Sequence, residues 1–189
     1  MKLEIKNLKD LPFTTWSGGT TTQLFIKPEN FTVKDDFDIR ISSATIDPGN
    51  STFSDFSKYN RFLTILEGWI DIAHPSEEVN QCVGKRLEKH IPYYFDGAIK
   101  TTSSSTIKVI DFNVIWKKSL AGIEVKILDF SKNTKIDLRN GEYFILSLEE
   151  NGKIVLFNDK LDLSKGDFIK INLLDTGIEV EGKFIFVKI

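Results

Sequence analysis

The sequence predicts an all-β fold, and three observations support this prediction. Short apolar or alternating segments recur along the 189 residues and are separated by Gly, Asn-Asp and Pro. Aromatic residues make up 12% of the chain, with 15 Phe against one Met, and this composition favours strands. No segment of a dozen residues keeps the i, i+3, i+4, i+7 apolar stripe of an amphipathic helix, so we expect few and short helices.

The expected strands follow from these apolar segments, and the turns from the residues between them. Some alternate between apolar and polar residues, whereas others are apolar on both faces, which is typical of a central strand. In chain order, the strands are expected at Leu3–Lys6, Thr21–Ile26, Phe37–Ile46, Arg61–Leu66, Trp69–Ala73, Thr106–Ile115, Val125–Asp129, Tyr143–Leu148, Lys153–Phe157, Asp167–Ile171 and Phe184–Val187. Turns are expected at 48–50, 67–68, 151–152 and 165–167.

A faint internal repeat suggests two similar halves. Residues 62–72 and 143–156 each read as a buried strand, a glycine turn and a second apolar strand, in the manner of a β-hairpin. Any two hairpins would look alike, so the repeat leaves gene duplication open. The economical description is a duplicated small barrel divided near residues 117–122. We therefore expect an N-terminal barrel over 1–118 and a C-terminal barrel over 119–189, packed closely on the first.

Composition excludes several classes of protein. Lys and Arg total 25 and Asp and Glu 27, so a net charge of −2 offers nothing to recruit nucleic acid or an anionic membrane. The single Cys82 rules out an intramolecular disulfide and fits a reducing cytoplasm. Neither a signal peptide nor an apolar membrane span is recognisable. We expect a cytoplasmic protein.

Two arginines on strand patterns are the strongest functional signal. Arg40 shares a strand face with the small residues Ser42 and Ala44, and Arg61 opens a strand that is apolar on both faces. A guanidinium is costly to bury without a partner, and its planar fork of donors suits a carboxylate. If both point into one cavity, they hold a small anion. The alternatives are a solvated Arg40 on an exterior face and an Arg61 that reaches water at its strand end.

Three further segments could contribute to a pocket. The stretch 17–22 is rich in hydroxyls, and its paired glycines can turn amides toward an anion, although a plain turn explains it equally well. Asp111 and Asn113 share one strand face and need partners, for which loop hydrogen bonds or an arginine would serve. The aromatic segment 53–59 could cover a cavity mouth or cap a barrel.

Metal and nucleophilic chemistry are disfavoured by the sequence. The chain has only two histidines, and a catalytic zinc or iron site usually needs two or three imidazoles with a carboxylate. His74 precedes Pro75 and His90 lies two residues before Pro92, so both are expected at the surface. Cys82 has no activating histidine nearby, and no GxSxG motif is present. No metal or other cofactor is predicted.

Several unlinked motifs over about residues 10–116 resemble the HutD/Ves family. They are Trp16-Ser17-Gly18-Gly19-Thr20, Arg40-Ile41-Ser42-Ser43-Ala44, Gly49 with Phe53-Ser54, Asn60-Arg61, Leu66-Glu67-Gly68 and Asp111-Phe112-Asn113. The resemblance implies a bicupin, meaning two packed jelly-roll type cupin barrels in one chain. Two departures are Ser17, where many members carry Asn, and Phe95-Asp96-Gly97, where the usual order is Phe-x-Gly-Asp.

The resemblance also implies a function. The family is associated with histidine utilisation in its HutD branch, where binding of formylglutamate or a similar acid has been proposed, and with stress response in its Ves branch. Neither branch has an established enzymatic activity. A homodimer is suggested by the resemblance and is not required by composition. Carried over by position, the ligand-binding residues are Trp16, Gly18, Gly19, Thr20, Arg40, Ser42, Arg61 and Asn113.

Three hypotheses follow. The shortage of catalytic groups favours a small-carboxylate binding protein with a regulatory or metabolite-buffering role. A metal-independent cupin isomerase or lyase is the alternative, and it would need Asp111, Glu67 or Tyr59 as general acid or base. The third reading is an interaction module whose barrel mouth is merely packed core.

Overall fold

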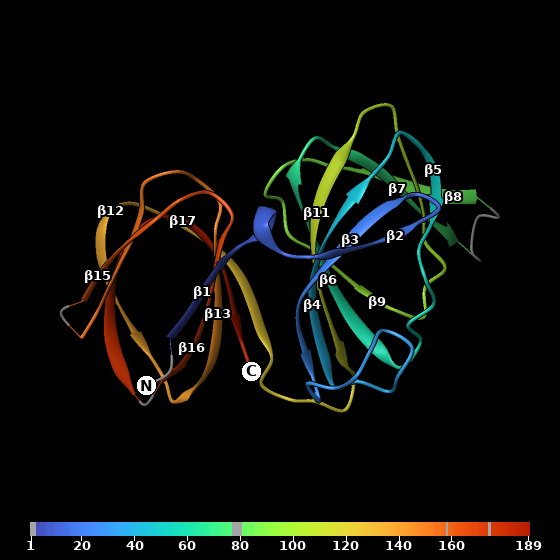
Figure 1. Ribbon diagram of the computed structural model, residues 1–189. Coiled ribbons are helices and arrows are strands. Elements are labelled where there is room, and N and C mark those ends of the chain that lie inside the picture. The colour runs from blue at the N-terminus through green and yellow to red at the C-terminus, as the bar shows by residue number, and fades with distance from the viewer. Residues whose placement is uncertain (1–2, 77–80, 158, 174) are drawn as a thin grey trace. The chain divides into compact units, whose positions relative to one another are not determined.

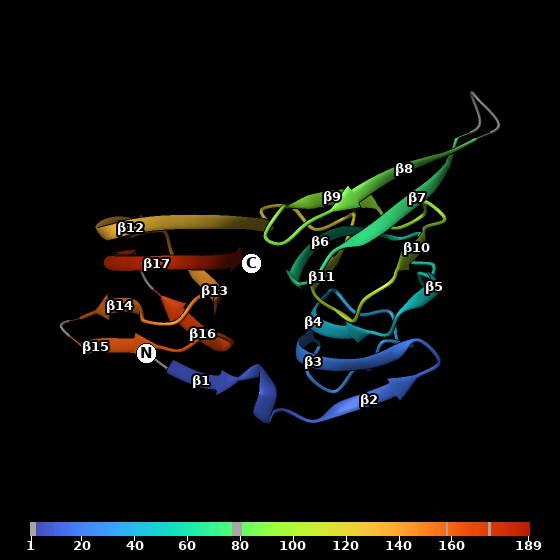
Figure 2. The ribbon, with the colours of Figure 1, turned by 90° about the horizontal axis from the view of Figure 1, so that it is seen from above.

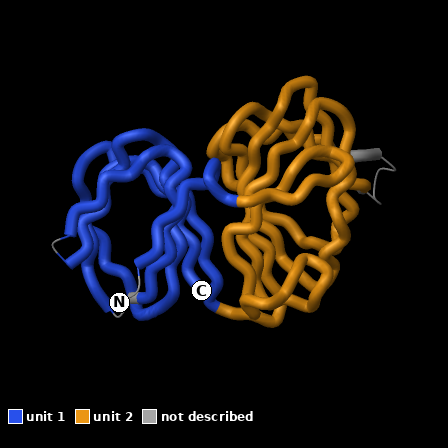
Figure 3. The backbone as a smooth tube through the Cα atoms, in the orientation of Figure 1, with its two compact units in different colours: residues 1–11, 122–189 blue, residues 12–121 orange. Residues whose placement is uncertain are grey.

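The computed structural model describes residues 3–76, 81–157, 159–173 and 175–189, and these residues form an all-β protein, as predicted (Figure 1). The one helical turn among them is a 3-10 turn at Leu8–Asp10, capped by the Asn7 side chain. No helix of this described part is long and apolar enough to cross a membrane. The chain divides into two compact units, Met1–Leu11 with Gly122–Ile189 (unit 1) and Pro12–Ala121 (unit 2), which Figure 3 shows in separate colours.

Unit 2 contains two antiparallel sheets. Figure 2 shows β2 beside β3 and β7 beside β8 as paired ribbons. The six-stranded sheet runs in the order β2 (Phe13–Trp16), β3 (Gly19–Lys27), β4 (Ile39–Ile46), β11 (Val109–Lys117), β6 (Tyr59–Glu67) and β9 (Tyr93–Asp96). The four-stranded sheet runs β5 (Gly49–Thr52), β10 (Thr102–Ser105), β7 (Ile70–Ser76) and β8 (Gln81–Leu87).

Unit 1 contains a single seven-stranded sheet that folds on itself around two long strands. The two long strands pair with each other from end to end except for a break in register between Phe130 and Thr134. The strands are β1 (Leu3–Asn7), β12 (Glu124–Leu138), β13 (Gly141–Ser147), β14 (Gly152–Leu156), β15 (Asp159–Leu163), β16 (Asp167–Leu173) and β17 (Thr176–Lys188). Residues 3–7, which the sequence analysis grouped with the first barrel, lie in this unit because β1 pairs with β16.

The same pairing scheme occurs in both units. In unit 2, β6 pairs with β9 and β11, and β7 pairs with β8 and β10. In unit 1, β13 pairs with β16 and the end of β17, and β14 pairs with β15 and the middle of β17. The two halves of β12 take the places of β4 and β5. The first half of β17 takes the place of β10, and its second half takes the place of β11.

The two expected hairpins are not hairpins, and this part of the sequence analysis was wrong. The partners of β6 lie in one sheet of unit 2 and the partners of β7 in the other, so the chain changes sheets at Gly68. Gly68 has φ +82°, a conformation that glycine adopts without strain. In unit 1, β13 and β14 both border β17 rather than each other. The local pattern of two apolar strands around a glycine does not reveal which strands pair.

Apolar side chains fill the interior of each unit differently. In unit 2, one cluster of buried side chains lies between the two sheets and includes Leu63, Ile65, Ile72, Leu87 and Val109. It fills only part of the space, because the inner face of β4 and β11 also carries polar residues. In unit 1, a continuous cluster of Ile, Leu, Val, Tyr and Phe fills the interior. The polar gap in unit 2 is where the candidate site lies.

Candidate functional site

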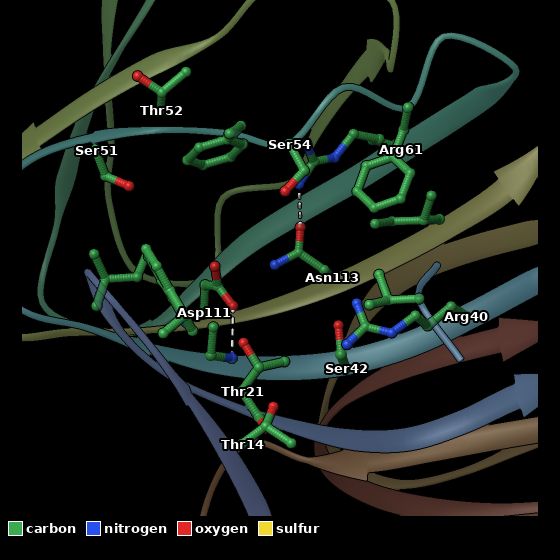
Figure 4. Close-up of a pocket in the computed structure, with 17 residues that line it drawn as sticks. Thr14, Thr21, Arg40, Ser42, Ser51, Thr52, Ser54, Arg61, Asp111 and Asn113 are labelled. Carbon is green, nitrogen blue, oxygen red and sulfur yellow. Dashed lines mark hydrogen bonds between the residues drawn. The ribbon is translucent and has the colours of Figure 1, made fainter. Parts of the chain in front are cut away.

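A cavity of about 310 Å³ opens in unit 2, lined by charged, hydroxyl and aromatic side chains (Figure 4). Its floor is the inner face of β3, β4, β11 and β6, and residues 51–56 of β5 and the following loop form a wall. The lining residues are Thr14, Trp16, Thr21, Val33, Arg40, Ser42, Ala44, Ile46, Ser51, Thr52, Phe53, Ser54, Phe56, Arg61, Asp111, Asn113 and Ile115.

Strand register places the two arginines in one row across three strands. Ile115 of β11 lies opposite Arg40 on β4 and opposite Arg61 on β6. Directly opposed residues of antiparallel strands point to the same face of the sheet, so both guanidinium groups lie on the cavity side. Neighbouring strands are about 4.8 Å apart, which puts the two Cα atoms about 10 Å from each other. This is a span that two arginine side chains can close around one small anion.

Arg61 is buried and held in an aromatic enclosure. Its Nη2 donates to Asn113 Oδ1 at 3.2 Å, while its Nε is buried with no hydrogen-bond partner among the described residues. The guanidinium carbon lies 4.8 Å from the ring centre of Phe53, 5.5 Å from that of Phe56 and 5.1 Å from that of Phe95. Burial, with a smaller effect of Arg40, lowers the pKa of Arg61 to about 10, so it stays charged at neutral pH.

Arg40 is buried beside it and anchored from a neighbouring strand. Its Nε donates to Gln23 Oε1 on β3 at 3.2 Å. Burial lowers the pKa of Arg40, and the nearby Asp111 partly offsets this. Neither arginine forms an ion pair with a carboxylate in the part of the chain that the structure describes. The cavity therefore holds two buried cations without a contacting counter-charge.

Asp111 is the buried acid of this cavity. Its Oδ1 accepts a hydrogen bond from the Ala44 backbone N–H at 2.9 Å, and the side chain is 2% exposed. Burial raises its pKa to about 6, despite the opposing effects of the Ala44 and Asn113 hydrogen bonds and of the two arginines. The sequence analysis left open whether Asp111 bonds to a loop or to an arginine. Asp111 accepts a hydrogen bond from the neighbouring strand β4 and one from Asn113 on its own strand, and its effect on the arginines acts at longer range.

The residues predicted for the site fall into two groups. Trp16, Arg40, Ser42, Arg61 and Asn113 line the cavity, whereas Gly18, Gly19 and Thr20 do not. The glycines shape the turn instead. A Cβ on Gly18 would come within 2.2 Å of the Trp16 ring, and one on Gly19 would come within 1.9 Å of the Thr45 carbonyl oxygen. They thus allow Trp16 to fold against the turn and β3 to approach β4.

Other lining residues escaped the sequence analysis or were only named as candidates. Thr14 was missed. Thr21 belongs to the hydroxyl-rich stretch 17–22 that was named as a candidate, and it lies opposite Ala44 in the same row as Asp111. Ser51 and Thr52 were missed because β5 is too short to show a pattern. In the aromatic segment, Phe53, Ser54 and Phe56 line the cavity, whereas Tyr59 packs with Phe37 in a separate cluster.

The histidines are not arranged for metal binding in the described residues, where no group of three or more His, Cys, Asp or Glu side chains converges. The expectation that His74 lies at the surface was wrong. It is on β7 and partly buried, with Nε2 at 2.8 Å from the Tyr93 hydroxyl and Nδ1 at 3.1 Å from Thr101 Oγ1. Burial lowers its pKa. The side chain of Cys82 lies outside the described part of the structure.

The family model for HutD matches residues 8–184, which is most of the chain. The chain belongs to the HutD family. No curated protein matches it significantly in sequence. The matched region spans both units of this HutD-family protein, including the C-terminal half, where the sequence motifs had given no specific indication.

Solved structures agree with this assignment at the level of the fold. HutD from Pseudomonas fluorescens SBW25 (formate condition) is 20% identical with a TM-score of 0.81, covering 99% of this chain and 97% of that one. A conserved protein of unknown function from Pseudomonas aeruginosa PAO1 is 17% identical with a TM-score of 0.84, covering 100% and 98%. A cupin 2 conserved barrel domain protein from Leptotrichia buccalis is 12% identical with a TM-score of 0.65, covering 98% and 96%. The fold is all-β and cupin-like.

Proposed function

We propose that this HutD-family protein binds a small carboxylate of the formylglutamate type in the cavity of unit 2. Its role is regulatory or metabolite-buffering, in histidine utilisation or in a stress response, on a cytoplasmic pool of the acid. The observation that carries the proposal is the pair of buried guanidinium groups, Arg40 and Arg61, which line one cavity and form no ion pair with a carboxylate of the described residues. The protein needs no metal ion or other cofactor for this task.

Burying a charged side chain away from water costs free energy. Two cations in a poorly hydrated cavity repel each other, and a bound anion relieves both the desolvation and the repulsion. An arginine fork binds a carboxylate through two parallel N–H···O bonds, and each such bond to a charged group is about twice as strong as a neutral one. The cavity volume of about 310 Å³ is at the small end of the range for ligand pockets, which suits an acid of metabolite size.

The repeated strand scheme supports a further part of the proposal, that the chain is a bicupin with a binding barrel and a barrel that serves as scaffold. The pairing of β4 to β11 is reproduced by β12 to β17 in the same chain order. Two independent folds would rarely share six pairings in one sequence, whereas duplication accounts for all of them at once.

A thermal-shift screen of short carboxylic acids, including formylglutamate, urocanate and glutamate, tests the binding. A ligand at 100 times its Kd should stabilise the protein by about 2.7 kcal/mol. The shift should disappear in Arg61→Met, which keeps a long side chain and removes the charge. Arg86→Met is the matched control, because Arg86 is an exposed arginine of the same unit that pairs with Asp71. An acid that stabilises Arg61→Met as strongly as the natural protein would contradict the proposal.

A metal-independent isomerase or lyase is the second candidate, and one observation favours it. Of the three nominated acid–base residues, Asp111 lines the cavity and has a pKa raised to about 6, within reach of a general base at neutral pH, whereas Glu67 and Tyr59 do not line it. Incubating each acid that binds with the protein in D₂O and following its C–H signals by NMR tests this function. Exchange of C–H for C–D, or conversion of the acid, that is lost in Asp111→Asn would support the enzymatic function. Unchanged spectra with the natural protein would favour the binding function.

A further inference from the structure

The cavity has two chemically different ends, and strand register fixes which residues form each. The row Arg40–Ile115–Arg61 forms the cationic end. Four residues along β11, a second row contains Thr21, Ala44 and Asp111. Four residues of an extended strand span about 13 Å, so the acid stands away from the two cations at the level of the backbone.

Asn113 lies between the two ends and keeps them apart. Its Oδ1 accepts the hydrogen bond from Arg61 Nη2, so its amide NH₂ is left to donate to Asp111. This second hydrogen bond lowers the pKa of Asp111 and so opposes part of the effect of burial. The orientation of the amide is therefore determined by its two neighbours. Because Arg61 bonds to Asn113 and Asp111 bonds to Ala44 and Asn113, the guanidinium N–H groups that remain can donate to a ligand.

Asp111 retains acceptor capacity toward the cavity. An ionised carboxylate has about four lone-pair positions. One oxygen of Asp111 accepts a hydrogen bond from the Ala44 N–H, and the carboxylate also accepts one from the Asn113 side chain. Figure 4 shows the second oxygen directed away from the Ala44 bond, with Thr21 next to the carboxylate. A ligand that fills this end and offers no donor would expel water and leave a buried acceptor unpaired, which carries a desolvation cost.

We infer that the ligand carries a hydrogen-bond donor remote from its carboxylate, a hydroxyl, amide N–H or ammonium group, and that Asp111 is the residue that selects for it. The inference rests on the proposed function, because it assumes that a carboxylate occupies the arginine end. It narrows the ligand from any small acid to an acid with polar groups at both ends, aligned along β11.

Isothermal titration with matched pairs of acids tests this selection. Butanoate is compared with 4-hydroxybutanoate and 4-aminobutanoate, and pentanoate with its 5-hydroxy and 5-amino derivatives, so that length and donor are varied separately. At the length that fits, the donor-bearing acid should bind at least about tenfold more tightly than the plain acid, the effect of one hydrogen bond to a charged group. Equal affinities at both lengths would overturn the inference even though the acids bind.

Asp111→Asn provides the matched variant. Its carbonyl oxygen can keep the Ala44 N–H bond, which leaves an NH₂ group facing the cavity. The ammonium group of 4-aminobutanoate has only donors and cannot accept from this NH₂ group, so this acid is the ligand for the comparison. The preference of the variant for 4-aminobutanoate over butanoate should fall to threefold or less. Because this preference is a ratio of two affinities measured on the same variant, it does not depend on how the substitution changes the affinity for plain butanoate, and binding of butanoate shows that the site is folded. A preference that survives in Asp111→Asn would assign the selection to another residue and refute the role of Asp111.

A pH series on the natural protein gives a second readout that needs no variant. Asp111 has a pKa of about 6, and the charged groups that face it, Arg40 from β4 and Arg61 from β6, remain protonated throughout this range. The preference for 4-aminobutanoate over butanoate should therefore shrink as the pH falls from 7.5 to 5. A constant ratio would contradict the inference. If no acid binds and Arg61→Met is also without effect, the proposed function itself fails, and the inference fails with it.

Discussion

Unit 1 and unit 2 share a strand scheme but differ in what their strands turn inward. The inner face of β11 in unit 2 carries Asp111 and Asn113, whereas the corresponding part of β17 in unit 1 carries Phe184 and Phe186. The two units share this scheme of strand pairing, so the shared pairing alone does not create a site. The difference teaches that the inward-facing positions of one or two strands decide whether such a barrel is a solid core or a binding cavity.

Charge is handled differently as well. In unit 1, surface charges form ion pairs, with Lys126 bonded to Glu124 and Lys183 to Asp129. In unit 2, each buried arginine donates to an amide, Arg61 to Asn113 and Arg40 to Gln23, and neither forms an ion pair within the part of the unit that the structure describes. Paired surface ions contribute little and bind nothing further. Amide partners orient a guanidinium without neutralising it, so its charge remains available to a ligand.

The largest expected effect comes from breaking the packed core of unit 1. Phe184→Ala should lower the free energy of unfolding by about 3–5 kcal/mol, because Phe184 is fully buried and its removal leaves a cavity. Urea denaturation followed by circular dichroism measures it. Phe157→Ala is the control, since Phe157 is exposed in the same unit. A loss below 1 kcal/mol would show that the interior of unit 1 is not the rigid core that its burial indicates.

Next in size, Arg61→Met should weaken carboxylate binding about 100-fold while leaving stability unchanged or raised. The natural side chain is buried without an ion partner, so a neutral side chain of similar length relieves its desolvation cost. Calorimetric titration gives the affinity and thermal unfolding gives the stability. A fall in the unfolding midpoint larger than that of Arg86→Met would mean that Arg61 has a structural role and would weaken the contrast between the two units.

The third effect is a pH dependence of the free energy of unfolding that arises from Asp111 in unit 2. The pKa of Asp111 is about 6 in the folded protein, against about 3.9 in an unfolded chain. The folded state therefore holds the extra proton between these values, and the free energy of unfolding falls as the pH rises from about 4 to 6. The decrease is on the order of 2 kcal/mol.

Comparing Asp111→Asn with the natural protein isolates this contribution from that of the surface acids. The difference in unfolding free energy between the two proteins should change between pH 4 and pH 6 and be constant above pH 7. A difference that is the same at every pH would indicate that Asp111 titrates normally, and so that the cavity is better hydrated than its burial implies.

The smallest effect tests the positioning of Arg40. Gln23→Leu removes the acceptor for Arg40 Nε and should weaken acid binding threefold to tenfold, with little change in stability because Gln23 is exposed. Titration calorimetry again gives the affinity. Lys27→Ala, on the same strand and exposed, should have no effect. If Gln23→Leu binds as tightly as the natural protein, Arg40 is positioned by packing alone.

The sequence by itself determined the all-β class and the place of most long strands. Apolar alternation is a local property, so segments such as β4, β6 and β11 were found with boundaries close to those observed. Alternation also showed that Arg40 shares a face with Ser42 and Ala44. The four-residue strands β2, β5, β9 and β10 were missed because so few residues carry no measurable period, and β8 and β15 were missed as well.

Only the tertiary structure decided the register. That Arg40 and Arg61 flank Ile115 depends on β11 inserting between β4 and β6, although it lies more than forty residues beyond β6 in the chain. The same is true of β1, which pairs with β16 at the other end of the sequence, and of β17, which joins into one strand what unit 2 divides into β10 and β11. Such pairings are set by contacts between distant segments, and one residue of slip would reverse every side chain.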